Sequence, residues 1–177
     1  MLLAAGHDVV VLDDLSTGDA RNLEGLPVRF VEGSILSDAA LDEAVAGADA
    51  IVHLAALGSV PRSVAAPMPT LAVNATGTAM VLEAARRHGG LHVLFAGSSS
   101  VYGANPTLPK HESLQPQPMS PYAASKLAAE SYVLSWAQSY GLPTLSFRFF
   151  NVFGPLQPAD HIYACLLYTS DAADELV

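Results

Sequence analysis

The stretch from Phe95 to Lys126, FAGSSSVYGANPTLPKHESLQPQPMSPYAASK, is the part of the sequence that decides the fold. It contains an apolar strand that ends in three serines, Ser98 to Ser100, and it closes on a Tyr-x-x-x-Lys spacing. If Tyr122 opens a helix, Lys126 lies one turn later on the same face. An ammonium at that distance stabilises a phenolate, so the spacing predicts an acid/base pair. The same spacing also occurs on ordinary exposed helices, so the surrounding segments must decide.

Length and composition indicate one domain, because 177 residues that are 51% hydrophobic can form a sizeable core. The net charge of -9, with scattered lysines and arginines, leaves no basic stripe for a nucleic-acid backbone. No apolar run approaches the ~18 residues of a membrane span, and the N-terminus lacks the basic region of a signal peptide. A single cysteine cannot form an internal disulfide and fits a cytoplasmic location.

Apolar runs alternate with helical patterns along the chain. Strands are expected at 9–12, 28–31, 50–54, 91–96 and 144–149, and helices at 38–46, 68–88 and 121–140. The strands are apolar throughout, which is typical of strands buried in a parallel sheet. The alternation therefore predicts an α/β fold, a doubly wound parallel sheet of the Rossmann type with helices on both faces.

The strand ends predict a dinucleotide site. Asp13 and Asp14 follow the first strand, where an open α/β sheet places the carboxylate that binds the adenosine ribose. Such a carboxylate repels a 2′-phosphate and favours NAD over NADP, although an aspartate that only ends a strand and begins a turn is the alternative. The third strand ends in Leu54, Ala55 and Ala56, where small side chains let a flat cofactor approach the backbone.

Two buried polar residues and the histidines complete the candidates. Asn74 lies in an otherwise apolar helix, which indicates a buried hydrogen bond that is either structural or directed at the cofactor. His53 lies within a strand and is interpreted as a packed core histidine. His88, His92 and His111 do not have the spacing of zinc ligands, so no metal site is expected.

Six phrases occur along the chain in a fixed order: VLDDLSTG at 11–18, VHLAA at 52–56, NATGT at 74–78, SSSVYG at 98–103, SPYAASK at 120–126 and RFFNVFGP at 148–155. Together they resemble the extended short-chain dehydrogenase/reductase family, in particular its nucleotide-sugar epimerase/dehydratase branch, which includes UDP-galactose epimerases. The resemblance extends to about residue 164 and implies a partial NAD-binding Rossmann domain at 1–164.

The resemblance implies a role for each site residue. Tyr122 would be the acid/base at a sugar hydroxyl, and Lys126 would hold the nicotinamide ribose, so that both contact the cofactor as well. Ser98 occupies the family's catalytic serine position beside the substrate, and Asn151 matches a residue near the substrate diphosphate. NAD would accept and return the hydride, while the protein supplies orientation and proton transfer. The implied substrate is a nucleotide sugar, most simply a UDP-sugar.

The residues after Ser98 distinguish between reactions within the branch. Sugar dehydratases place Asp-Glu directly after the catalytic threonine, because elimination of water needs a second acid and base. This chain has Ser99 and Ser100 there, which favours an epimerase. Two alternatives stay open: a reductase or dehydrogenase of the same superfamily that acts on a non-sugar substrate, and a non-catalytic nucleotide-sensing Rossmann protein.

The resemblance also implies missing parts. The family begins with a strand and a glycine-rich turn that binds the pyrophosphate, and this chain is expected to start inside the following helix, whose last turn ends at Gly6. The C-terminal substrate domain is expected to be missing too, so we expect this chain to bind NAD poorly, fold marginally and lack activity. The segment 165–177 begins with CLLYTSDAADE, which resembles a translated transposase adapter, and is expected to be non-native. Family members often form homodimers through two long helices, here 68–88 and 121–140.

Overall fold

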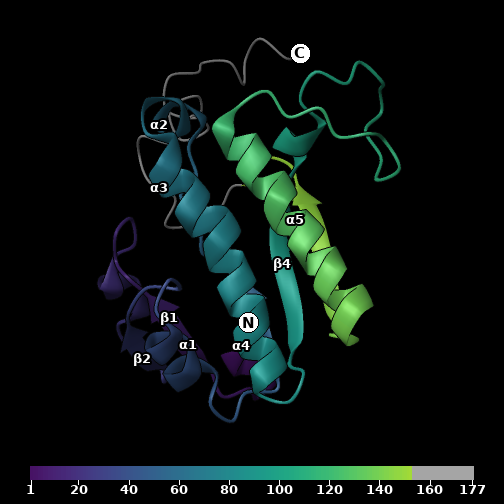
Figure 1. The fold of residues 1–177 in the computed structure, drawn as a ribbon. Helices are drawn as coiled ribbons and strands as arrows, with labels where there is room; N and C mark the ends of the chain where they lie inside the picture. The colour runs from purple at the N-terminus through teal and green to yellow at the C-terminus, as the bar shows by residue number, and fades with distance from the viewer. Residues whose placement is uncertain (153–177) are drawn as a thin grey trace, which may run out of the picture.

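The computed structural model describes residues 1–152, and its five strands form two parallel sheets (Figure 1). The first sheet pairs β1 (Val10–Asp13) with β2 (Arg29–Glu32). The second has the order β3 (Ala50–His53), β4 (His92–Ser98) and β5 (Thr144–Phe149). All five predicted strands are therefore present, and the fold is Rossmann-like. The expected non-native tail lies outside the described residues.

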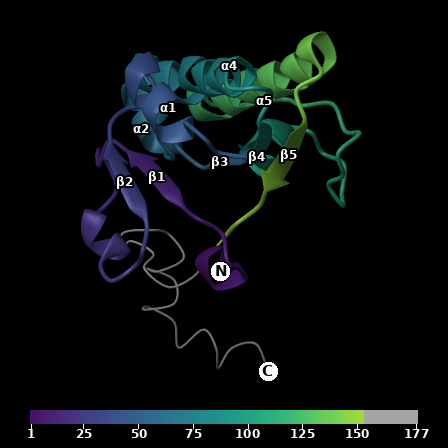
Figure 2. The ribbon, with the colours of Figure 1, turned by 90° about the horizontal axis from the view of Figure 1, so that it is seen from below.

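The helices connect the strands and lie on one side of them (Figure 2). They are α1 (Asp38–Val45), α2 (Val60–Ala65), α3 (Pro67–Leu71), α4 (Thr78–Arg87) and α5 (Pro121–Tyr140). A π-helical segment, η3 (Ala72–Gly77), joins α3 to α4, so the helix predicted at 68–88 is one nearly continuous run with a wider turn in its middle. Three short 3-10 segments are η1 (Leu3–Ala5), η2 (Ala20–Leu23) and η4 (Ser99–Tyr102). The sequence patterns did not predict α2.

Local sequence signals fix the ends of α5, which has its predicted bounds. The Ser120 hydroxyl accepts a hydrogen bond from the Ala123 N–H at 3.1 Å, and Pro121 occupies the first helical position, where its missing N–H costs nothing. At the other end Gly141 adopts a left-handed conformation with φ of 66°, which glycine reaches without steric strain. These signals place Tyr122 in the first turn of the helix.

The core lies between the second sheet and the helices. Val93 and Phe95 of β4 are 0% and 1% exposed, and they pack with Leu82 of α4 and Val133 of α5. In β5 the residues directed at the helices are partly buried, whereas Leu145, Phe147 and Phe149 on the other side are exposed. Within residues 1–152 helices thus cover one face of the sheet, rather than the two faces expected of the doubly wound arrangement. In the same residues β1 and β3 are not paired with each other.

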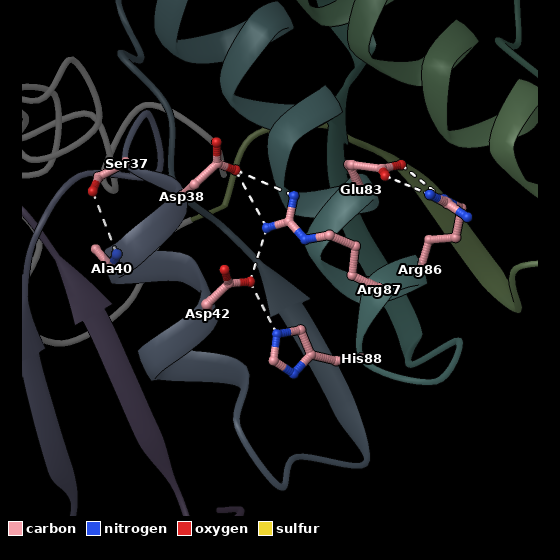
Figure 3. Close-up of polar contacts among 8 residues, drawn as sticks. All are labelled: Ser37, Asp38, Ala40, Asp42, Glu83, Arg86, Arg87 and His88. Carbon is pink, nitrogen blue, oxygen red and sulfur yellow. Dashed lines mark hydrogen bonds and ion pairs between the residues drawn. The ribbon is translucent and has the colours of Figure 1, made fainter.

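A cluster of ion pairs joins α1 to the end of α4 (Figure 3). The guanidinium of Arg87 contacts the carboxylates of Asp42 at 2.8 Å and Asp38 at 3.3 Å, and His88 Nε2 lies 2.9 Å from Asp42. The hydrogen bond from Arg87 and then that from His88 lower the pKa of Asp42. These side chains are partly exposed to solvent, so the cluster fixes the position of α1 more than it stabilises the fold.

The junction of β4 and β5 generates a stability prediction. A Cβ added to Gly97 would overlap the carbonyl oxygen of Phe147 on β5, a backbone atom that cannot move alone. We therefore expect Gly97→Ala to lower the free energy of unfolding by about 2 kcal/mol or more, measured by urea denaturation. Gly58→Ala is the matched control, because a Cβ there meets no atom within 4 Å. Equal stability of the two variants would contradict this packing.

Candidate functional site

A pocket at the carboxyl ends of β1 and β3 brings together residues that are far apart in the sequence. Asp13 and Asp14 line it from β1 and the loop after it, and Ala55 and Ala56 line it from the segment after β3. Ser16, Thr17, Gly33, Ile35, Leu57 and Val73 complete most of the wall. Four of the predicted cofactor residues therefore share one pocket, whereas the Leu54 side chain is 66% exposed and does not line it.

The loop after β1 presents two carboxylates at this pocket. The Leu15 N–H donates to Asp13 Oδ1 at 2.8 Å, and the Ser16 N–H donates to Asp14 Oδ1 at 3.0 Å. Hydrogen bonds from the Ser16 side chain and backbone lower the pKa of Asp14, so it is ionised at neutral pH. A Cβ on Gly18 would lie 3.2 Å from both Asp13 carboxylate oxygens, which shows how tightly the loop folds over the Asp13 carboxylate. The pocket rim is consequently negative.

Asn74 ties the pocket wall to α5. Its Oδ1 accepts a hydrogen bond from the Leu57 N–H at 2.8 Å, and its Nδ2 donates to the Leu57 carbonyl at 3.3 Å and to Ser125 Oγ at 3.0 Å. Ser125 Oγ in turn donates to the Tyr122 carbonyl at 2.8 Å. Asn74 and Ser125 are each 1% exposed. The amide of Asn74 thus has a structural role, and its contact with a cofactor stays a prediction.

His53 belongs to the same buried hydrogen-bond network as Asn74. Its Nε2 lies 2.9 Å from Thr78 Oγ1, and the Thr78 hydroxyl donates its proton to the Asn74 carbonyl at 2.6 Å. The histidine must therefore donate through Nε2. Burial, and to a smaller extent the charge of Lys126, lowers the pKa of His53 to about 3, so the ring is neutral. His53 is packed in the core as predicted.

Lys126 is buried between α5 and β4. Only 4% of the residue is exposed, its Nζ donates to the Ala96 carbonyl at 2.9 Å, and Nζ lies 5.1 Å from the centre of the Phe95 ring. Burial lowers the pKa of Lys126 to about 8. Tyr122 is partly exposed one turn earlier on α5. A lysine of α5 that is anchored to β4 and has a lowered pKa suits acid/base chemistry near neutral pH.

Ser98 lies at the carboxyl end of β4, two residues after the carbonyl that binds Lys126. Its Oγ accepts a hydrogen bond from the Ser100 N–H at 3.2 Å and lies 2.8 Å from Ser100 Oγ, so Ser98 begins η4. Because α5 packs against both β4 and η4, Ser98, Tyr122 and Lys126 come from adjoining elements. Asn151 is exposed two residues beyond β5.

Sequence reasoning missed one buried ion pair that joins α5 to β5. Arg148 of β5 and Glu130 of α5 form a bidentate pair with N–O distances of 2.6 to 3.2 Å, and their side chains are only 14% and 9% exposed. The signal was the four-residue spacing from Lys126 to Glu130, which places both residues on one face of the helix. Within residues 1–152 no cluster of three metal-ligating side chains is present, and no helix in this part of the chain is long and apolar enough to cross a membrane.

The buried ammonium of Lys126 generates a prediction about stability. Burial lowers its pKa to about 8 from 10.5, so the unfolded chain binds more protons between these pH values and stability rises with pH across that window. Lys126→Met should remove this rise and increase the free energy of unfolding at pH 7 by about 2 kcal/mol. Urea denaturation at pH 7 and pH 10 measures both effects. A variant that is less stable than the parent at pH 7 would contradict the predicted cost of the buried charge.

Comparison with known proteins identifies a family and several relatives of this chain. A model of the NAD dependent epimerase/dehydratase family matches residues 1–171. The chain is 42% identical over 163 residues to a UDP-glucose 4-epimerase of Mycolicibacterium smegmatis, covering 88% of this chain and 52% of that protein. It is 35% identical to a dTDP-glucose 4,6-dehydratase of Streptomyces niveus, covering 97% of this chain and 52% of that protein.

A solved structure gives the same result for the fold. The UDP-glucose 4-epimerase of Thermus thermophilus, determined in complex with NAD, superposes with a TM-score of 0.86 at 36% identity, covering 94% of this chain and 55% of that one. The chain therefore spans about half the length of the relatives it matches. On this combined basis the chain belongs to the NAD-dependent epimerase/dehydratase family, an enzyme family that acts on nucleotide sugars.

Proposed function

We propose that this chain carries the cofactor-binding and catalytic part of an NAD-dependent epimerase that acts on a nucleotide sugar, most simply a UDP-sugar. The observation that carries the proposal is the position of Lys126. Its ammonium is buried against the carboxyl end of β4, one turn after Tyr122 on α5, and it binds the Ala96 carbonyl, two residues before Ser98. The UDP-glucose 4-epimerase relatives support the choice of substrate.

The residues around the pocket fit NAD. The carboxylate of Asp13, with that of Asp14 beside it, suits the adenosine ribose hydroxyls and repels a 2′-phosphate. Ala55 and Ala56 leave the pocket wall open to a flat ring, and the preceding Leu54 would contribute its backbone. When bound, NAD supplies the hydride transfer, which the side chains cannot perform.

Asn74 would affect cofactor binding indirectly, because it holds the pocket wall in position. Both polar ends of its amide bind the Leu57 backbone, so the asparagine sets the position of the segment after β3. A direct contact from Asn74 to the cofactor remains part of the proposal.

The proposed catalytic residues have different roles in the proton transfer. Tyr122 takes the proton of the sugar hydroxyl, and Ser98 orients that hydroxyl by a hydrogen bond. Lys126 stabilises the phenolate and holds the nicotinamide ribose through its ammonium hydrogens. Asn151, exposed after β5, would approach the substrate diphosphate.

Epimerisation is favoured over dehydration by the residues after Ser98. Ser99 and Ser100 open η4, and the Ser100 hydroxyl is hydrogen-bonded to Ser98. A serine hydroxyl has no accessible charge near neutral pH, so this pair cannot supply the second acid and base that elimination of water needs.

The whole protein is proposed to be a cytoplasmic homodimer. Exposed apolar side chains on the two long helical runs, among them Met68, Leu71 and Leu134, support pairing through these helices. The 177-residue chain alone is proposed to bind NAD weakly and to be inactive, since β1 and β3 do not pair with each other in the part of the chain that the structure describes.

The test uses the protein encoded by the complete gene. It should interconvert UDP-glucose and UDP-galactose without net production of NADH, and Tyr122→Phe should lower the turnover number at least ~100-fold while NAD binding is kept. Tyr132→Phe, on the exposed side of the same helix, is the matched control and should be active. Net reduction of NAD with a non-sugar alcohol would favour a dehydrogenase instead. Full activity of Tyr122→Phe would contradict the proposed role of Tyr122, and NAD binding without turnover by the unsubstituted protein would favour a nucleotide-sensing protein.

A further inference from the structure

Arg148 occupies a junction of four segments around the catalytic helix. Its guanidinium binds both carboxylate oxygens of Glu130 on α5, and its NH1 donates to the Glu112 carbonyl in the long loop before α5 at 3.2 Å. Its Cζ lies 4.9 Å from the centre of the Tyr102 ring of η4. The residue itself lies on β5, opposite Gly97 in the register with β4. One side chain therefore holds the strand, the helix, the loop and η4 together.

Glu130 is the carboxylate nearest to Lys126 along α5. The two residues are four apart, so their side chains lie on one face with Cβ atoms about 5–6 Å from each other. In the structure the two side chains nevertheless diverge. Glu130 binds Arg148 toward β5, whereas Lys126 Nζ binds the Ala96 carbonyl on β4. Within residues 1–152 no ion pair joins Lys126 to a carboxylate.

We propose that Arg148 is a positioning residue. It keeps the Glu130 carboxylate in an ion pair and so leaves the ammonium of Lys126 free to contact the cofactor and Tyr122. The proposal rests on the proposed function for its catalytic meaning, but the side-chain arrangement that it describes is independent of substrate. Without the guanidinium, Glu130 is a buried carboxylate without its partner, and Lys126 is the cation closest to it on the same helix face. Pairing of the two would draw Nζ away from Ala96.

The remaining groups around Lys126 do not compete for its charge. His53 on β3 is neutral, and η3 and α4 contribute only amide and hydroxyl groups to the buried hydrogen-bond network. Tyr122 precedes Lys126 on α5, and Tyr102 of η4 faces the Arg148 guanidinium. The Glu130 carboxylate is therefore the one negative group on the described part of α5 that loss of Arg148 would release toward Lys126.

The titration of Lys126 can be measured directly, because Lys110 and Lys126 are the two lysines of the sequence. Lysine-selective 15N labelling gives two side-chain NMR signals, and Lys110→Arg assigns them. The pKa of Lys126 can thus be titrated without cofactor or substrate. A failure of this inference is therefore distinguishable from a failure of the proposed function, which the sugar assay reports.

The experiment is a double-mutant cycle. In Arg148→Met the midpoint of the Lys126 titration should rise by about one pH unit or more, as expected for an opposite charge within reach. Glu130→Gln alone should leave the midpoint nearly unchanged, and Arg148→Met combined with Glu130→Gln should restore it. Arg21→Met, which removes an exposed arginine, controls for the change in net charge.

Each outcome decides the proposal. If Arg148 merely supports the packing, water enters in both Arg148→Met variants, and the midpoint rises equally in the single and the double variant, which would overturn the inference. An unchanged midpoint in Arg148→Met would overturn it as well. If Arg148→Met does not fold, Arg148→Lys takes its place in the cycle, because it keeps the charge and loses the bidentate geometry. That variant should show a smaller rise, again abolished by Glu130→Gln.

Discussion

The structure buries one ammonium, that of Lys126, between the helix α5 and the strand β4. A buried charge is costly unless hydrogen bonds compensate it, and here the Ala96 carbonyl and the Phe95 ring offset only part of that cost. Both belong to β4, so the lysine is stable only while α5 lies flat against that strand. The capping residues fix the two ends of α5, and Gly97 permits the close approach of β4 and β5.

A second constraint connects the lysine to the pocket. Asn74 lies in the π-helical turn, and the wider turn directs its amide at both the Leu57 backbone and Ser125. The pocket at the carboxyl ends of β1 and β3 and the helix α5 are thereby joined through a buried asparagine rather than through apolar packing alone. Such a bond is directional, so it fixes the distance between the pocket wall and α5 more closely than apolar contacts do.

Much of this arrangement could be predicted from the sequence where the signal is local. The bounds of α5 follow from Ser120, Pro121 and Gly141, and the strand ends at Asp13 and Ala55 predicted the pocket that the structure brings together. The pairing of Glu130 with Arg148 could not be predicted, because it joins residues from a helix and a strand whose alignment only the folded sheet determines. For the same reason the sequence left the role of Asn74 open, since its partners come from two separate segments.

In the proposed function, the pocket at the carboxyl ends of β1 and β3 and Lys126 of α5 bind the two ends of one NAD molecule. A crystal structure of the protein encoded by the complete gene, grown with NAD, measures this most directly. We expect the Asp13 carboxylate to accept hydrogen bonds from the adenosine ribose and Lys126 Nζ to donate to the nicotinamide ribose. A cofactor that leaves Asp13 or Lys126 without contact would contradict it.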